Sequence, residues 1–330
     1  MAHFVIIATK RIRNKFIYKK NTENSHLFDN LVIRIFSGGI QLKTAFIIDS
    51  TAYASEEIMN HPDVYELKLI TVFDDGTEFL DSSNIELQEE FYKKLKNSKT
   101  LPVTSQPSPG KYIELIEEVI EKGYDQLICI HISAAFSGAY QTAKMITENY
   151  SDQIESIVID SKGVSLVMEY MVVQALEMLE KDLDLETIEE NLNWVARESV
   201  VYLTVSDLKY VVAGGRIGPA QAKLGNLLKI KPLLYMDENG EVQLLDKIRT
   251  DKRINRRLAE IADEAVEAYP NGVMLGFAHA VDELRMEKAI SEVNKLLPEV
   301  DYQTATLGPV IGTHTGAGTI GMGTIPIADY

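Results

Sequence analysis

The stretch Thr44-Ala45-Phe46-Ile47-Ile48, followed by Asp49-Ser50-Thr51, decides the fold class. A short, uninterrupted apolar run predicts a strand that is covered on both faces, as in the middle of a parallel sheet. Residues 126–132 form a second run of this kind, and residues 154–159, followed by Asp160-Ser161, form a third. Segments with helical periodicity separate these runs. We therefore predict an α/β fold with a wound parallel sheet.

Polar side chains follow each of these predicted strands. Ligands of open α/β sheets bind beyond the carboxyl ends of the strands, which share one edge of the sheet. We therefore expect the polar strand ends to converge on one rim and to support a binding site. The residues concerned are Asp49, Ser50 and Thr51, then Ser133, Ser137 and Gly138, and finally Asp160 and Ser161.

The segment Thr104-Ser105-Gln106-Pro107-Ser108-Pro109-Gly110 contains three hydroxyls, two prolines and one glycine. We expect a loop here, because this composition is incompatible with a continuing helix or a central strand. Ser108 and Pro109 have the order of an N-cap and a first helical residue. The loop can hold an anion at the helix N-terminus, or it is an ordinary capped connection.

Two other segments set the domain organisation. Before the Thr104 loop, the run 64–72 predicts one strand, and the turn Asp74-Asp75-Gly76 predicts a hairpin. After the polar segment 181–187, strands and helices alternate again, including a helix that reaches about Leu228. We predict two α/β domains, 44–180 and 181–330, with an approximate boundary. The C-terminal segment is able to pack back on the first domain.

The first 43 residues differ in charge from the rest. They hold eight Lys/Arg and two Asp/Glu, whereas the whole chain has a net charge of −16. A basic nucleic-acid-binding arm is one interpretation. We favour the other, an N-terminal extension outside the domain, with the true translation start near Leu42.

Composition excludes several classes of protein. With 330 residues, of which 45% are hydrophobic and 25% charged, the chain is typical of a globular protein with two domains. The net charge of −16 disfavours binding to nucleic-acid phosphates. No apolar run reaches the roughly 18 residues that a membrane-spanning helix needs. The single cysteine, Cys129, lies in an apolar strand and cannot form an intrachain disulfide, which fits a reducing cytoplasm.

Enzymatic chemistry has weaker support. A serine hydrolase could use Thr104, Ser133 or Ser137, but no Gly-x-Ser-x-Gly motif surrounds them. The histidine and cysteine spacing of common metal sites is absent, so we expect no metal and no cofactor. The glycine-rich run 312–318 lacks the lysine of a phosphate-binding loop, and we expect a tight turn there. It nevertheless presents His314 between Thr313 and Thr315, all three able to bind an oxygen-bearing group.

Six short motifs occur along the chain in this order: Asp49-Ser50-Thr51, Thr104-Ser105-Gln106-Pro107-Ser108, Ile132-Ser133 with Phe136-Ser137-Gly138, Asp160-Ser161, Leu208-Lys209-Tyr210 with Gly214-Gly215-Arg216-Ile217, and Gly308-Pro309-Val310-Ile311-Gly312-Thr313-His314-Thr315-Gly316. Together they resemble the DegV family of bacterial fatty-acid-binding proteins, which includes the FakB subunits of fatty acid kinase. The resemblance extends from about Lys43 to the C-terminus. One departure is Ala317, where the family pattern has proline.

The resemblance implies two α/β domains with a fatty acid in a tunnel between them. It implies that Thr104, Ser137 and His314 bind the carboxylate, and that Ser105, Thr313 and Thr315 belong to the supporting loops. It also implies that Arg216 docks on a separate kinase subunit, which phosphorylates the bound carboxyl group to an acyl-phosphate.

We therefore expect a cytoplasmic lipid carrier without catalytic residues of its own, which feeds phospholipid synthesis. Its expected partners are a long-chain fatty acid and the kinase subunit, with no nucleic acid and no stable membrane insertion. The alternative is a stand-alone serine-type hydrolase acting on lipids or esters. The apolar segment 164–179, with Met168, Met171 and Met178, is either a wall of the tunnel or ordinary core.

Overall fold

The computed structural model describes residues 42–218, 220, 222 and 230–330. The predicted extension up to residue 41 and most of the helix expected to reach Leu228 lie outside these residues. Lys43–Tyr330 forms one compact unit, and the expected internal boundary near residue 180 stays a prediction. No helix in the described part of the chain is both long and apolar enough to cross a membrane.

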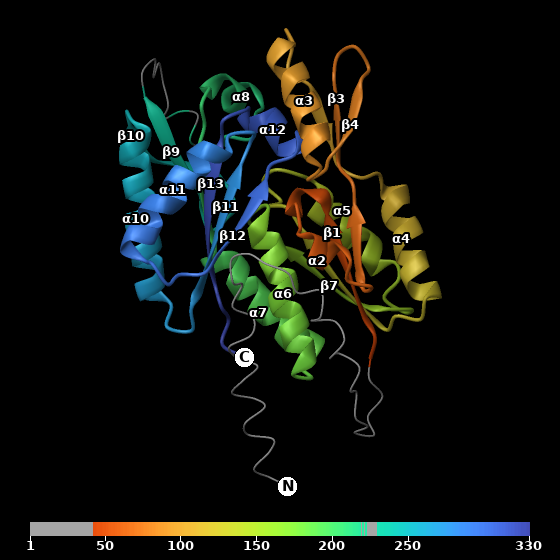
Figure 1. Ribbon diagram of the computed structural model, residues 1–330. Helices are drawn as coiled ribbons and strands as arrows, with labels where there is room; N and C mark the ends of the chain where they lie inside the picture. The colour runs from red at the N-terminus through yellow and green to blue at the C-terminus, as the bar shows by residue number, and fades with distance from the viewer. Residues whose placement is uncertain (1–41, 219, 221, 223–229) are drawn as a thin grey trace. The chain divides into compact units, whose positions relative to one another are not determined.

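A four-stranded parallel sheet forms the centre of the first half of this unit (Figure 1). Its strand order is β2-β1-β6-β7, and every neighbouring pair is parallel. The apolar runs of the sequence become its central strands, so the predicted α/β fold with a parallel sheet is confirmed. The strands are β1 (Thr44–Asp49), β2 (Val64–Leu67), β6 (Gln126–His131) and β7 (Glu155–Asp160).

Helices cover both faces of this sheet, as the continuous apolar runs require. Along β1, Ile47 packs with α4 and α5, whereas Phe46 and Ile48 pack on the opposite face with α6 and α7. The helices are α4 (Pro109–Glu121), α5 (Ala139–Glu148), α6 (Leu166–Glu180) and α7 (Leu185–Glu198); the 3₁₀ helix η2 (Ser50–Ala52) and α2 (Glu56–Met59) follow β1.

A six-stranded sheet in the order β10-β9-β8-β13-β11-β12 forms the second half, and only β11 and β12 are parallel neighbours in it. One face packs on α10 and α11, and the other packs on α6. Helix α6 therefore lies between the two sheets, which explains why it is apolar on most of its surface. The elements are β8 (Val200–Thr204), β9 (Lys231–Met236), β10 (Val242–Ile248), α10 (Asp251–Ala268), β11 (Val273–His279), α11 (Glu283–Leu296), β12 (Tyr302–Thr306) and β13 (Ile320–Pro326).

A small antiparallel sheet, β4-β3-β5, packs with α3 around a cluster of aromatic side chains that includes Phe73, Phe79 and Phe91. The predicted hairpin is confirmed as β3 and β4. The prediction of one strand over 64–72 is wrong, because the chain leaves the parallel sheet after β2 and enters the small sheet at β3. The elements are β3 (Ile70–Val72), β4 (Glu78–Leu80), α3 (Ile85–Asn97) and β5 (Val103–Ser105).

Two expected loops contain regular structure. Thr104 lies in β5, an edge strand paired with β3 opposite Thr71, so the prediction of a loop is wrong at that residue. Proline is tolerated just beyond such an edge strand. Residues 312–315 of the glycine-rich run belong to a short helix, α12 (Pro309–Thr315), so the expected turn is limited to residues 317–318. Helix α12 contacts α8 (Leu208–Ala213) and α3. Ser108 precedes α4 as predicted, but its side chain makes no capping hydrogen bond.

Candidate functional site

A cavity of about 580 Å³ opens where the four-stranded sheet, the six-stranded sheet and α12 meet. This volume is within the range of small-molecule binding sites. On the side of the first half of the chain, its walls are the loop after β6, the first turn of α6, and β5. On the side of the second half, they are α12 and the face of β8, β13 and β11 that is turned to α6. The cavity therefore lies at the carboxyl ends of the parallel strands, where the sequence predicted a site.

The polar end of the cavity centres on His314, in the last turn of α12. Its Nε2 lies 2.9 Å from the Thr104 hydroxyl, and its Nδ1 lies 3.1 Å from the Gly214 carbonyl oxygen. Because a carbonyl only accepts, Nδ1 carries the hydrogen in the neutral ring, and Nε2 accepts the hydrogen bond of the Thr104 hydroxyl. Residues 210 positions apart in the sequence therefore meet directly.

The charge state of His314 follows from its surroundings. Burial and, to a smaller extent, the nearby Arg216 cation lower the pKa of His314 to about 4, although the bond to the Gly214 carbonyl opposes both. The ring is therefore neutral at pH 7. A neutral imidazole at the polar end of a buried cavity is ready to gain a proton when an anion arrives beside it.

Ser137 belongs to the same polar end, on the loop between β6 and α5. Its Oγ accepts a hydrogen bond of 3.2 Å from the Ala139 amide, the first residue of α5. This bond leaves the hydroxyl hydrogen available to donate to another group. The N-terminus of α5 next to it favours negative charge.

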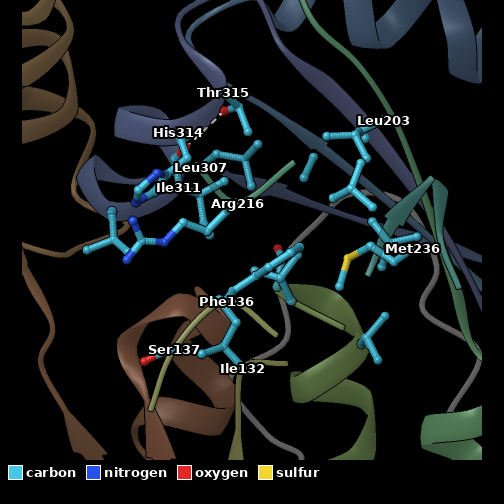
Figure 2. A pocket seen from close by; sticks show the side chains of 18 of the residues that line it. Ile132, Phe136, Ser137, Leu203, Arg216, Met236, Leu307, Ile311, His314 and Thr315 are labelled. Atoms are coloured by element: carbon cyan, nitrogen blue, oxygen red, sulfur yellow. Dashed lines mark hydrogen bonds between the residues drawn. The ribbon is translucent and has the colours of Figure 1, made fainter. Parts of the chain in front are cut away.

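Arg216 is exposed and lines the cavity near His314 (Figure 2). Its guanidinium donates a hydrogen bond of 3.1 Å to the Gly214 carbonyl, the same oxygen that faces His314 Nδ1. An exposed arginine therefore lies at the polar end of the cavity.

The rest of the lining is mostly apolar. Figure 2 shows His314, Arg216 and Ser137 on one side of the cavity and Leu203 and Met236 on the other. Most of the apolar wall comes from the second half of the chain and was missed by the sequence analysis, because strand residues that line a cavity look like ordinary core. The lining residues of this kind include Val201, Leu203, Val211, Met236, Val242, Leu307, Val310 and Ile311.

The methionines of α6 do not form the wall that was considered for them. Met168, Met171 and Met178 are fully buried in the core between the sheets. Only the beginning of the helix, Leu166 and Val167, lines the cavity. The alternative of ordinary core packing is therefore the correct one for these methionines.

Comparison with known proteins decides the family. The family model described as "Uncharacterised protein, DegV family COG1307" matches residues 43–326. The chain belongs to the DegV family. It is 35% identical over 283 residues to a DegV domain-containing protein of Halalkalibacterium halodurans, covering 85% of this chain and 97% of that one. A DegV domain-containing protein of Streptococcus pneumoniae is 33% identical over 292 residues, covering 87% of this chain and 100% of the other.

Solved structures of similar proteins share the fold. A fatty-acid-binding DegV family protein from Streptococcus agalactiae superposes with a TM-score of 0.80 at 30% identity, covering 86% of this chain and 99% of that one. DegV from Bacillus subtilis, described as a fatty-acid-binding protein, gives a TM-score of 0.75 at 31% identity, covering 86% and 99%. A stearic-acid-binding protein from Eubacterium ventriosum gives 0.75 at 27% identity, covering 86% and 98%.

The other motif residues divide into those that line the cavity and those behind it. Ser105, Gly138 and Thr315 are in the lining. Seven others are not among the described residues that line it: Asp49, Ser50, Thr51, Ser133, Asp160, Ser161 and Thr313.

These seven residues hold the cavity walls through hydrogen bonds. The Asp49 carboxylate accepts the Ile132 amide at 2.9 Å and so joins β1 to the loop after β6. The Asp160 carboxylate accepts the Ala134 amide of the same loop at 3.0 Å. The other five act as donors: the Ser50 hydroxyl donates to Asp81, the Thr51 amide to Asp49, and the hydroxyls of Ser133, Ser161 and Thr313 to the carbonyls of Gly240, Gly163 and Pro309.

Proposed function

We propose that this chain binds a long-chain fatty acid, with the carboxylate at Thr104, Ser137 and His314 and the hydrocarbon tail along the apolar lining. The observation that carries the proposal is the one-sided polarity of the cavity. Fatty-acid binding by related DegV proteins supports it. Burying a methylene contributes about 0.8 kcal/mol, so a long tail supplies on the order of 10 kcal/mol before the costs of association.

The proposed role is that of a cytoplasmic carrier. The carboxylate is presented to a separate kinase subunit, which phosphorylates it to an acyl-phosphate for phospholipid synthesis, and Arg216 contributes to docking. The exposure of Arg216 beside the polar end supports this part, because a partner that contacts it is close to the carboxylate. No cofactor is needed for such a role.

The geometry does not favour the hydrolase alternative. In the described part of the chain, His314 contacts Thr104 and the Gly214 carbonyl, so no carboxylate orients it as a general base. The Ser137 hydroxyl contacts the Ala139 amide and not a histidine. Both side chains are better suited to bind an anion than to attack an ester.

Native mass spectrometry of the purified protein tests the proposal. A co-purifying mass equal to that of a fatty acid is the expected result. A protein that carries no fatty acid, takes up none when mixed with it and turns over ester substrates would overturn the carrier role in favour of the hydrolase.

The head-group assignment is tested with the double variant Thr104→Ala/His314→Ala. We expect a fatty-acid Kd at least tenfold higher, because two polar groups facing the carboxylate are lost. Thr100→Ala is the control, since its hydroxyl contacts Asp74 at the surface and not the cavity. An unchanged Kd in the double variant would contradict the assignment.

Docking is tested with Arg216→Ala, compared with the exposed Arg253→Ala on α10. We expect Arg216→Ala to keep its fatty-acid affinity within a few fold and to lose acyl-phosphate formation when the kinase subunit is supplied. If Arg216→Ala loses lipid binding instead, the arginine belongs to the carboxylate site and not to the docking surface.

A further inference from the structure

The floor of the cavity is a strip of six residues of the six-stranded sheet, and three of them are glycines. Strand pairing places residues of β8, β13 and β11 side by side in two rows, and all six residues line the cavity. We call these rows the first rung and the second rung. The first rung is Leu203, Gly321 and Ala278, and the second is Val201, Gly323 and Gly276.

Alternation along the strand places both glycines of β13 on the cavity side. Ile320 and Met322 pack with α10 and α11 on the opposite face, although Met322 also borders the cavity. The strand leads away from α12, which holds His314, so Gly321 is nearer the polar end and Gly323 is deeper. Two residues of a strand advance by about 7 Å, which is the spacing of the two rungs.

A Cβ atom fits at both of these glycines, although the core around them is packed. A Cβ atom added at Gly321 would meet no atom nearer than 3.5 Å, and one at Gly323 would meet none nearer than 3.6 Å. These are ordinary contacts, so the fold itself does not require glycine at either position. At Gly276 the situation differs, because a Cβ would lie 2.9 Å from Leu166 of α6.

The strip ends one row further on. There Ile325 of β13 pairs with Met274 of β11, and both side chains are buried in the core with α6. Neither is among the described residues that line the cavity. The large side chains of this row therefore end the floor of the cavity directly after the second rung.

We propose that Gly321 and Gly323 set the length of acyl chain that the cavity accepts, with Ile325 as the stop at its end. This inference rests on the proposed fatty-acid binding. The missing side chains give the tail its path along β13, and a side chain at Gly323 or Gly321 shortens that path by one or two rungs. Chain-length preference is therefore encoded in three positions of a single strand.

The experiment measures Kd for saturated fatty acids from capric to arachidic acid with delipidated full-length protein. The variants are Gly323→Val, Gly321→Val and Ile325→Ala, and Thr324→Val is the control because Thr324 lies on the same strand and outside the cavity lining. Circular dichroism and thermal melting show whether each variant is folded. Gly323→Ala, whose added methyl makes only ordinary contacts, replaces any valine variant that does not fold.

We expect Gly323→Val to weaken the binding of the longest chains by about fourfold for each methylene that no longer fits, and to leave capric acid within twofold. Gly321→Val moves this limit to still shorter chains, and Ile325→Ala moves it to longer ones. Equal weakening at all chain lengths, or an unchanged length profile, overturns the inference. If the wild-type protein binds no member of the series, the proposed function itself fails.

Discussion

Protonation of His314 gives the proposed site a measurable signature. In this structure, the pKa of His314 is about 4 because of burial and the Arg216 cation, and Nε2 accepts a hydrogen bond from the Thr104 hydroxyl. An arriving carboxylate needs donors, but the Thr104 hydrogen already points at the ring. If Nε2 gains a proton, the ring becomes a donor and the Thr104 hydroxyl is free to turn to the carboxylate. We therefore predict that binding a fatty acid takes up a proton at neutral pH.

Two opposing free energies set the size of this effect. Protonating a group with a pKa of about 4 at pH 7 costs about 4 kcal/mol, at 1.36 kcal/mol for each pH unit. A carboxylate about 4 Å from the imidazolium returns about 4 kcal/mol at an effective dielectric constant of 20. Because the two nearly cancel, binding raises the pKa of His314 into the neutral range, and we expect an uptake of roughly half a proton at pH 7. The complex favours the protonated ring, so affinity increases as the pH falls and decreases as it rises.

Isothermal titration calorimetry at pH 7 in buffers of different ionisation enthalpy measures this uptake directly. The slope of the observed enthalpy against the buffer enthalpy is the number of protons taken up. His314→Gln should reduce the slope to near zero, whereas His61→Gln should retain it because His61 lies in a turn outside the cavity lining. A zero slope in the wild-type protein, or a slope that survives in His314→Gln, would refute this reasoning.

Two further predictions concern the packing around α12. Burial raises the pKa of Asp81 to about 7, although three hydrogen bonds oppose this, so the folded state keeps the Asp81 carboxyl protonated and the wild-type free energy of unfolding falls by up to ~4 kcal/mol as the pH rises from about 4 through 7. Asp81→Asn should remove this loss, which denaturation curves at pH 5 and pH 8.5 measure. If the wild-type protein and the variant lose the same stability between these pH values, the prediction is wrong. Gly316→Ala should lower the melting temperature more than Gly215→Ala. Both glycines have a positive φ, but only at Gly316 would an added Cβ meet a side chain, at 2.3 Å from Tyr210 Cδ2. Equal losses in the two variants would show that the contact is unimportant.

The parts of the fold that could be predicted from the sequence are those in which the residue pattern of a single segment determines its secondary structure. The strands of the parallel sheet are buried on both faces, so β1 and β6 are continuous apolar runs whatever packs on them. Their polar ends could be placed at one rim because parallel strands end at the same edge. The helices between them have ordinary periodicity.

The rest depends on contacts between distant segments. Strand β5 has only three residues and exists because β3 pairs with it, so Thr104 looked like a loop residue. The wall of the cavity comes from strands whose alternation predicts burial equally well against a helix or against a ligand. Only the register of β13 with its neighbours shows that Gly321 and Gly323 share one open surface.

The glycine-rich end of the chain shows why His314 could be proposed as a site residue from the sequence while its structural setting could not be predicted. The glycines predicted a turn, but Gly312 and Gly316 instead allow helix α12 to pack closely between two tyrosines. A Cβ at Gly312 would lie 2.5 Å from the Tyr92 hydroxyl, and one at Gly316 would lie 2.3 Å from the Tyr210 ring. Helix α12 is thereby held against α3 and α8, and its last turn brings Nε2 to Thr104. The glycines place the histidine, and in this way residues without side chains contribute to the proposed carboxylate site of His314, Thr104 and Ser137.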